Sequence, residues 1–353
     1  MTKMKAISSI NRRRRISTRA AGTKKQEDNV VVTYSSSHTI VPTYECFNKC
    51  LYCNFRTNIG ASGWMSLDRV ESIFSDLKLK IAILILSGEV HPKAKNRSKW
   101  HRHIVDICKL AIDYGFFPHT NVGPLSRTEM LSLKKVNASM GLMLEQVTPK
   151  LMQNVHRFAP SKAPTLRLEQ LRMAGELGIP FTTGILLGIG ENEDDRVRTI
   201  EAISDIATTY GHIQEVIVQP YSPGEKDRWA ARAPDGTSGG GYYDINLLPQ
   251  FVQMTREMLP DDVVVQIPPN LLNVADGKDI LIKCLNAGAR DLGGISPKDE
   301  VNPNYSFPKT SELSQMLADH GFTLQRRSCV HEPYDAQKPS LSHKFQQAPN
   351  SHL

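Results

Sequence analysis

The alternation of short apolar segments with amphipathic segments is the feature that most restricts how this 353-residue chain can fold. Eight runs rich in β-branched and other apolar residues predict strands: Thr39–Thr43, Ile81–Leu86, Phe116–Thr120, Ser139–Leu144, Pro180–Leu187, Ile213–Gln219, Val263–Ile267 and Ala289–Ile295. Helical patterns lie between them: Leu67–Leu79, His103–Tyr114, Arg127–Lys135, Leu166–Leu177, Asp194–Tyr210, Leu247–Met258 and Ala275–Asn286. Eight strands with helical crossovers favour a (β/α)8 TIM-type barrel, an α/β fold, over an open doubly wound sheet.

Polar or Gly/Pro-containing clusters follow the predicted strands. The first cluster is the cysteine-containing loop after the first strand. The other seven are Ser87–Glu89, Asn121–Gly123, Glu145, Gly188–Glu191, Gln219–Pro220, Pro268–Asn270 and Gly293–Pro297. In a barrel of this kind the carboxyl ends of the strands share one face, and functional sites lie there. We therefore predict a single rim of site-building loops.

Charge separates the chain into a body and its extensions. Residues 1–25 hold nine Lys and Arg and no acid, whereas the other residues hold 34 bases and 36 acids. The near-neutral body does not predict a nucleic-acid-binding surface, despite a formal net charge of +7. We expect a basic disordered extension over residues 1–30, one barrel over 31–330, and a disordered C-terminal tail over 331–353.

The basic extension leaves three interpretations open. It is a disordered segment, an organelle transit peptide, or an arm that binds nucleic acid. No apolar run approaches ~18 residues, and no signal-peptide core is visible, so neither a membrane span nor secretion is expected. We expect a cytoplasmic location, or a plastid or another organelle if the extension is a transit peptide.

Three of the six cysteines, Cys46, Cys50 and Cys53, lie within the loop after the first predicted strand, in a C-x3-C-x2-C pattern. Three thiolates so spaced are suited to three irons of a cubane iron–sulfur cluster, which leaves the fourth iron free to bind a ligand. There are three alternatives to such a cluster: half of a zinc site, a chance clustering of cysteines, and the cluster loop of a ferredoxin-type electron carrier. The zinc site lacks a second Cys/His pair at zinc-finger spacing, and the carrier lacks a nearby fourth cysteine.

Three further groups are candidates for ligand binding. Ser87-Gly88-Glu89 follows an apolar strand. It either binds the amino group of a ligand or forms a turn without a binding role. Glu145 points into the barrel mouth or forms a salt bridge. Arg167, at the start of a helix, is part of a solvated face or pairs with a carboxylate. The glycines from Gly184 to Gly190 lack the order of a nucleotide-phosphate loop, which excludes triphosphate binding through that motif.

These residues resemble the radical S-adenosylmethionine (radical SAM) family. The cysteine loop with Tyr52 before the last cysteine is typical of it, and longer stretches resemble one branch, the CofG-type subunit of 7,8-didemethyl-8-hydroxy-5-deazariboflavin (FO) synthase. Those stretches are Gly123–Ser126, Val136–Glu145, Val155–Lys162, Ile179–Glu191, Tyr210–Gln219, Gln266–Asn270, Asp291–Pro297 and Val301–Pro303. The chain departs from the branch at Tyr221–Gly241, at Leu292 and at Glu300.

The resemblance implies a set of site residues. Cys46, Cys50 and Cys53 would hold a [4Fe-4S] cluster whose open iron chelates S-adenosylmethionine. Ser87, Gly88 and Glu89 would contact the amino group of that ligand, and Arg167 would contact its carboxylate. Glu145 would bind its ribose or methionine part, Tyr52 would pack near the adenine, and Gly188 to Glu191 would lie near the adenosine.

The resemblance also implies a reaction. A 5′-deoxyadenosyl radical would abstract hydrogen from a small-molecule substrate, the tyrosine-derived ribitylaminouracil adduct, and ring closure with loss of ammonia would give FO, the precursor of coenzyme F420. A CofH-type subunit would supply the adduct, and a reductant such as ferredoxin or flavodoxin would supply the electron. The catalytic proton acceptor is unknown, although Asn121, Gln219, Asn270 and Asp291 are candidates.

Three other functions stay open from the sequence. The chain could be the adduct-forming CofH-type partner, or a radical enzyme related to biotin synthase or to hydrogenase maturation. It could also be a non-catalytic iron–sulfur scaffold or electron carrier. The stretches Met140–Glu145 and Ala159–Lys162 argue against the enzyme rivals, and biotin synthase would need cysteines for a second cluster.

Overall fold

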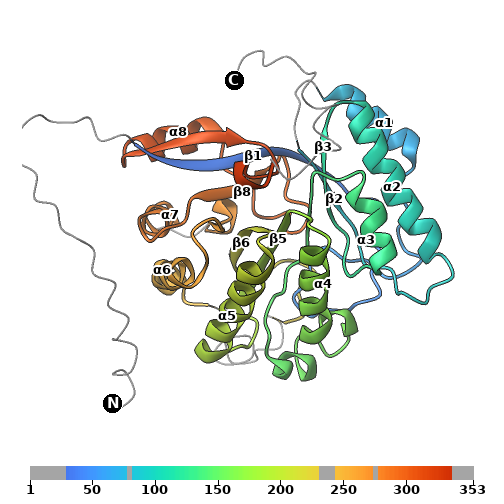
Figure 1. The fold of residues 1–353 in the computed structure, drawn as a ribbon, viewed down its shortest axis with the longest axis horizontal. Coiled ribbons are helices and arrows are strands. Elements are labelled where there is room, and N and C mark those ends of the chain that lie inside the picture. Colours follow the sequence, from blue (N-terminus) through green and yellow to red (C-terminus); the bar gives the residue numbers. More distant parts are fainter. Residues whose placement is uncertain (1–28, 78–81, 230–242, 273–276, 336–353) are drawn as a thin grey trace, which may run out of the picture.

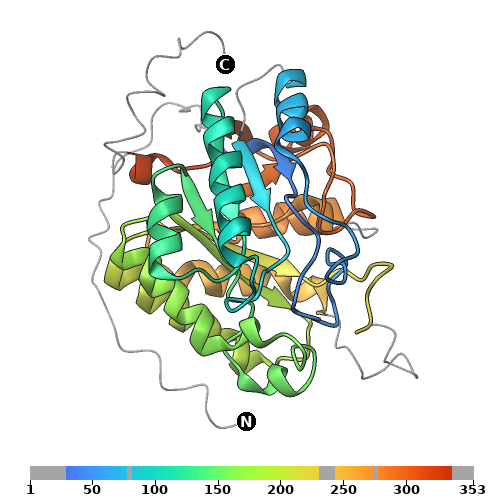
Figure 2. The same ribbon diagram turned by 90° about the vertical axis from the view of Figure 1, so that its right-hand side faces the viewer.

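Eight parallel strands close into a barrel, as predicted (Figures 1 and 2). The structure, a computed structural model, describes residues 29–77, 82–229, 243–272 and 277–335. The barrel strands are β1 (Val30–Ile40), β2 (Ala82–Leu86), β3 (Phe117–Asn121), β4 (Ser139–Gly141), β5 (Phe181–Leu187), β6 (Ile213–Pro220), β7 (Val264–Gln266) and β8 (Asp291–Ile295). β1 pairs with both β8 and β2, which closes the ring.

Helices on the outside of the barrel connect successive strands, as the crossovers of a parallel sheet require. They are α1 (Leu67–Asp76), α2 (Arg97–Asp113), α3 (Arg127–Lys134), α4 (Pro164–Glu176), α5 (Glu193–Tyr210), α6 (Leu248–Met258) and α7 (Gly277–Asn286). Their apolar faces pack on the barrel strands around fully buried residues such as Trp100, Phe181 and Ile203. This packing fixes the strands, and through them the loops at the carboxyl ends.

Two predictions about the elements were wrong at the ends of the barrel. β1 begins at Val30 and not at Thr39, because the serine-rich stretch Ser35–Ser37 is strand in spite of its polarity. A ninth strand, β9 (Phe322–Arg327), and the preceding α8 (Thr310–Ala318) were not predicted. β9 pairs in parallel with Val30–Ser35, whereas β2 pairs with Ser37–Ile40, so β9 extends the sheet beside the amino-terminal half of β1.

Most of the predicted tails lies outside the described residues. Their inner ends are exceptions: Val30 starts β1, and residues 331–335 include the short helix α9 (Glu332–Asp335). Tyr334 is buried, and its hydroxyl donates to the backbone oxygen of Ile213 at 2.8 Å. The first residues of the predicted C-terminal tail therefore pack against the barrel.

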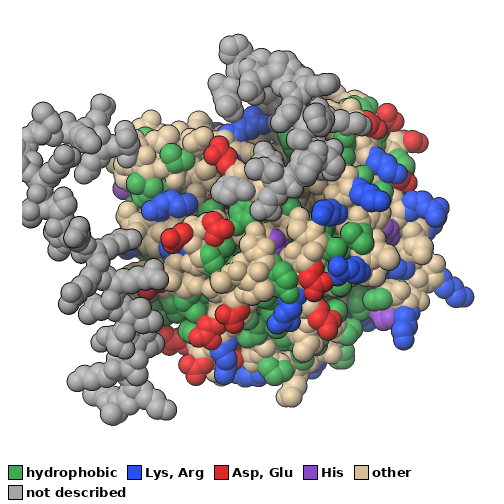
Figure 3. Space-filling model, viewed as in Figure 1, with side chains coloured by type: hydrophobic (Ala, Val, Ile, Leu, Met, Phe, Trp, Pro, Cys, Tyr) green, Lys and Arg blue, Asp and Glu red, His purple; other side chains and the backbone are tan. Residues whose placement is uncertain are grey.

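The outer surface fits the near-neutral body inferred from composition. On the face shown in Figure 3, acidic and basic side chains are interspersed, with Lys and Arg more frequent over α1, α2 and α3. Within the described residues, no helix has the length and apolar character needed to cross a bilayer.

Candidate active site

A cavity of about 400 Å³ lies inside the barrel and brings together most of the residues predicted from the sequence. Nine of them line it: Cys46, Cys50, Tyr52, Cys53, Ser87, Gly88, Glu89, Glu145 and Arg167. They come from the loops after β1, β2 and β4 and from the start of α4. The predicted rim at the carboxyl ends of the strands thus forms one site.

The cysteine loop is held by backbone hydrogen bonds to the neighbouring loops. The amide of Phe47 donates to the oxygen of Glu89, that of Lys49 to Phe158, and that of Leu51 to Val155. Gly88 lies directly under the loop: a Cβ at this position would be 2.2 Å from the backbone oxygen of Glu45. Glycine at residue 88 therefore lets the strand end approach the cysteine loop.

Burial and a backbone contact act in opposite directions on the thiol of Cys46. The backbone amide of Glu89 donates to the sulfur of Cys46 at 3.3 Å, a contact that favours the thiolate. Burial raises the pKa of Cys46 to about 11 and that of Cys50 above its usual range, so these thiols would release protons on binding iron.

Glu89 and Arg167 form a buried ion pair, with 2.7 Å between the guanidinium nitrogen and the carboxylate oxygen. The second oxygen of Glu89 accepts from Asn48 at 2.8 Å and from the hydroxyl of Ser161. Burial alone would raise the pKa of Glu89, but the charges of Arg167 and Lys162 outweigh it and hold this pKa below its usual range. Arg167 is 2% exposed, so it does not belong to a solvated helix face.

Glu145 both lines the cavity and forms a salt bridge, so its two predicted roles coexist. Its carboxylate lies 2.5 Å from the ammonium of Lys162. Burial and the charge of Arg167 oppose the ammonium form of Lys162, but nearby negative groups, Glu145 foremost, raise its pKa. Glu145 has a φ of 66°, in the left-handed region that residues other than glycine rarely adopt. Such local strain is typical of functional sites.

Tyr52 forms an aromatic pair with His156 beside the cysteines. The tyrosine hydroxyl and Nε2 of His156 are 3.1 Å apart, and the two rings meet edge to face. Burial, with the positive charges of Lys162 and Arg167, lowers the pKa of His156 to about 2. The imidazole is therefore neutral, and it orients Tyr52 at the cavity wall.

Gly188 and Glu191 are the two predicted site residues that do not line the cavity. The carboxylate of Glu191 instead accepts from the amides of Gly188 and Ile189, at 2.7 and 2.8 Å, and pairs with Arg196. The side chain of Glu191 is fully buried. The arrangement stabilises the loop after β5.

Sequence reasoning did not single out four polar residues of the site, namely Asn48, His156, Ser161 and Lys162. Asn48 lies inside the cysteine motif, and the other three lie within the family-like stretch from Val155 to Lys162. They occupy loops and short 3-10 turns, where no periodicity marks an inward-facing side chain. Only their position within the cysteine motif or within the family-like stretch offered a signal.

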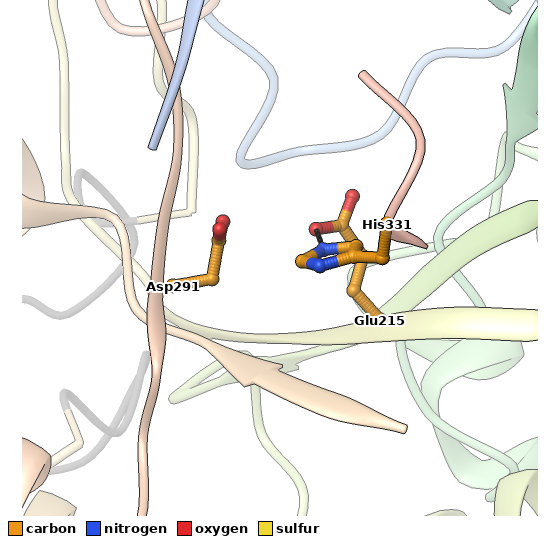
Figure 4. A group of neighbouring side chains, drawn as sticks. All are labelled: Glu215, Asp291 and His331. Atoms are coloured by element: carbon orange, nitrogen blue, oxygen red, sulfur yellow. Dashed lines mark hydrogen bonds and ion pairs between the residues drawn. The ribbon is translucent and has the colours of Figure 1, made fainter. Parts of the chain in front are cut away.

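Of the candidate proton acceptors, Asn121, Gln219 and Asn270 line the cavity, and Asp291 does not. Asp291 is the first residue of β8, so it lies at the end of the barrel opposite to the cysteine loop. There it forms a group with Glu215 and His331, with His331 hydrogen-bonded to Glu215 at 3.0 Å (Figure 4). Arg327 pairs with both carboxylates, at 2.6 Å to Asp291 and 2.7 Å to Glu215. Its guanidinium already supplies the cation that these acids need, so the group does not indicate a metal site.

Comparison with known proteins identifies the family and the fold. A family model described as the Radical SAM superfamily matches residues 40–203. Among solved structures, the hydrogenase maturase HydG from Carboxydothermus hydrogenoformans is similar in fold (TM-score 0.67, 18% identity, covering 90% of this chain and 76% of HydG). Methylornithine synthase (PylB) is also similar (TM-score 0.62, 16% identity, 84% of each chain). At these identities the likeness concerns the fold alone.

Curated relatives are much more similar in sequence. The 7,8-didemethyl-8-hydroxy-5-deazariboflavin synthase of Trichodesmium erythraeum is 53% identical over 307 residues, which cover 86% of this chain and 92% of the relative. The enzyme of the same name from Thermosynechococcus vestitus is 50% identical over 321 residues, 90% of this chain and 98% of the relative. The chain therefore belongs to the radical SAM superfamily and, within it, to the family of 7,8-didemethyl-8-hydroxy-5-deazariboflavin (FO) synthases.

Proposed function

We propose that Cys46, Cys50 and Cys53 hold a [4Fe-4S] cluster and that S-adenosylmethionine binds beside it in the barrel cavity. When bound, the cluster would supply the electron that cleaves the sulfonium and yields a 5′-deoxyadenosyl radical. The observation that carries this proposal is the shared cavity: all three cysteines line the same hollow as Glu89, Glu145 and Arg167.

The hydrogen-bonding capacity of these side chains supports their assignment to S-adenosylmethionine. Arg167 has five N–H donors, and among the described residues it forms three hydrogen bonds, to Ser161, Met143 and Glu89. The unused donors suit a ligand carboxylate. Glu89 accepts three side-chain hydrogen bonds, which leaves acceptor capacity for an ammonium group.

We assign the remaining contacts with S-adenosylmethionine from the positions of the side chains around the cavity. We assign the ribose or methionine part of the ligand to Glu145 and the adenine to the ring of Tyr52, since both line the cavity. Ser87 and Gly88 would approach the amino group through their backbone, because the serine hydroxyl donates to the oxygen of Gly88 and accepts from Trp100. Gly188 and Glu191 would act indirectly, by shaping the loop after β5.

We further propose the substrate and the products. The substrate would be the adduct of a tyrosine-derived hydroxybenzyl group with a ribitylaminouracil, made by a CofH-type partner. Hydrogen abstraction, ring closure and loss of ammonia would then give FO. Closure of the barrel around the ligands would keep water away from the radical. Free thiols and a reducible cluster suit a reducing compartment, so we propose a cytoplasmic location.

One assay tests the proposed function. The cluster is reconstituted anaerobically, and dithionite, S-adenosylmethionine and the adduct are added. Fluorescent FO together with 5′-deoxyadenosine is the expected result, and a Cys50→Ala variant should form neither. Cleavage of S-adenosylmethionine without FO would identify a different radical enzyme, and full activity of Cys50→Ala would refute the cluster assignment.

The same assay separates this chain from a CofH-type enzyme. Tyrosine and the ribitylaminouracil replace the adduct, and no partner subunit is added. No FO precursor should form under these conditions. Formation of the adduct by this chain alone would favour the CofH-type function.

A further inference from the structure

A second hollow, of about 820 Å³, borders the cysteine loop and is lined mostly by exposed residues, so we call it the outer hollow. Cys50 and Cys53 line both hollows. The cysteine loop therefore borders both the barrel cavity and the outer hollow. An electron that enters through the outer hollow need not pass the ligands inside the barrel.

The outer hollow is basic. Five cations line it, Lys49, Arg56, Arg157, Lys226 and Arg228, against two acids, Glu225 and Asp227. Among the described residues, none of these five cations forms an ion pair. Asp227 is engaged by the hydroxyl of Tyr221 and by the amide of Trp229. Within the part of the chain that the structure describes, the hollow thus offers positive charge that no acid pairs with, beside Cys50 and Cys53.

An exposed aromatic side chain adds a contact surface. Phe158 is 54% exposed, and the guanidinium of Arg157 lies 4.7 Å from the centre of its ring. Aromatic residues and arginine are the types most enriched where protein partners bind.

Backbone hydrogen bonds tie the basic residues to the cysteine loop. The amide of Lys49 donates to the oxygen of Phe158 at 2.8 Å, and the amide of Arg228 donates to the oxygen of Leu51 at 2.8 Å. Figure 2 shows the blue loop after β1 beside the yellow segment after β6. A partner that binds these residues would consequently have a fixed position relative to the cluster ligands.

We infer that the outer hollow is the docking site of an acidic ferredoxin-type electron carrier. This inference rests on the proposed function, since only a reducible cluster at Cys46, Cys50 and Cys53 needs a donor. One electron leaves the carrier, which is oxidised, and reduces the cluster, and no bond or proton is exchanged. Plant-type ferredoxins are low-potential donors, as cleavage of a sulfonium demands, and negative charge on the carrier would be steered to the basic hollow.

The test uses the full chain and a plant-type [2Fe–2S] ferredoxin kept reduced by NADPH and its reductase. The double variant Arg157→Glu/Lys226→Glu reverses two exposed charges of the hollow. The matched control, Lys109→Glu/Arg172→Glu, makes the same charge change on exposed positions of α2 and α4. Binding of oxidised ferredoxin is measured by calorimetry with and without the cluster, and cluster reduction is followed by electron paramagnetic resonance.

We expect the hollow variant to bind ferredoxin at least ten-fold more weakly and to be reduced by it at least ten-fold more slowly at low salt. The control variant should match the unmodified chain, whose rate should fall as salt rises. Reduction by dithionite and dithionite-driven FO formation should be unchanged in both variants. Failure of FO formation with dithionite would therefore count against the proposed function and not against the docking site.

Three results would overturn the docking site as stated. Ferredoxin could bind and reduce the hollow variant as well as it does the control. A flavodoxin, and not ferredoxin, could be the carrier whose rate depends on the two charges. Heparin could compete for the hollow with the affinity of ferredoxin, which would indicate a general polyanion site.

Discussion

At the scale of single residues, Arg167 links the stability of the site to ligand binding. Its guanidinium is 2% exposed and donates to Glu89 and to the backbone oxygens of Ser161 and Met143. It therefore joins α4 to the loops after β2 and β4. A buried carboxylate that loses its partner is costly, so this side chain holds the site together before any ligand binds.

Replacement of Arg167 should destabilise the chain even without a cluster. Arg167→Met leaves Glu89 buried without its charged partner, and we expect a loss of about 3–5 kcal/mol in the free energy of unfolding. Chemical denaturation of the cluster-free protein measures it. Arg172→Met, on an exposed position of the same helix, should change stability by less than about 0.5 kcal/mol. Equal stability of the two variants would show that the ion pair contributes nothing.

Glu145 permits a binding prediction. S-adenosylmethionine is a sulfonium cation, and Glu145→Gln removes a negative charge from a cavity that holds Lys162 and Arg167. We expect about ten-fold weaker binding of S-adenosylmethionine, equivalent to about 1.4 kcal/mol. Equilibrium dialysis with the reconstituted protein measures the dissociation constant. Glu176→Gln, at an exposed pair with Arg127, is the control, and unchanged binding by Glu145→Gln would remove Glu145 from the ligand site.

At the scale of elements, the cysteine loop depends on close approach to the end of β2. A methyl group at residue 88 would collide with backbone and not with a flexible side chain, so the loop itself would have to move. The position of the three thiols is thus determined partly by a residue that binds no iron.

Gly88→Ala should therefore impair cluster assembly. We expect less than about half of the iron content of the unmodified chain after reconstitution, because the 2.2 Å contact with Glu45 displaces the loop. Iron and sulfide analysis measures it. The control is Gly321→Ala, which is strained by its φ of 81° but meets no atom within 4 Å and precedes β9. Full iron content in Gly88→Ala would contradict the packing argument.

The start of α3 gives a prediction about pH. Ser126 and Glu129 form a capping box, and Glu129 also pairs with Arg97 at 2.7 Å. Burial would raise the pKa of Glu129, but the hydrogen bonds from Arg97 and Ser126 prevail and lower it to about 2. A depressed pKa stabilises the fold above the unfolded value, near 4.5, and this contribution disappears as pH falls towards 2.

Glu129→Gln should accordingly lose stability at neutral pH and not at low pH. We expect a deficit of about 1–3 kcal/mol above pH ~5 that shrinks towards zero near pH ~2. Urea denaturation of the cluster-free protein at several pH values measures it. Glu312→Gln, at an exposed pair with Lys309, should show no such trend. A deficit that is independent of pH would assign the effect to packing.

At the level of the whole molecule, the sequence predicted the barrel and the cysteine loop, but not the ion pairs that join the site residues to one another. Strand and helix periodicity identified the barrel strands β2 to β8, but only the last two residues of β1. β9 was missed because Phe322–Arg327 contains only two apolar residues, Phe322 and Leu324, and ends in two arginines. The ion pairs of Arg167 and Lys162 join residues far apart in the chain, and such partners cannot be read from local patterns.

The two ends of the barrel have different roles, one in ligand binding and one in stability, as is common in TIM-type folds. The carboxyl ends of the strands hold the cysteines, whereas the opposite end holds Arg327 between Glu215 and Asp291. Glu215 and Arg327 line the far end of the same cavity. Burial would raise the pKa of Glu215, but the charge of Arg327 outweighs it and depresses this pKa strongly. Arg327 thereby ties β9, which lies outside the closed ring, to β6 and β8.

Arg327→Met should weaken the fold without disturbing the cluster. Two buried carboxylates would lose their cation, and we expect a loss of about 3–5 kcal/mol in the free energy of unfolding. Iron content and the dissociation constant for S-adenosylmethionine should stay the same, because the residues assigned to them lie at the carboxyl ends of the strands, whereas Arg327 lines the opposite end of the cavity. Lys309→Met, at a side chain that is 80% exposed, is the control for loss of a positive charge. If Arg327→Met lowered iron content as much as stability, the two ends of the barrel would be coupled, and the separation of tasks would not hold for this enzyme.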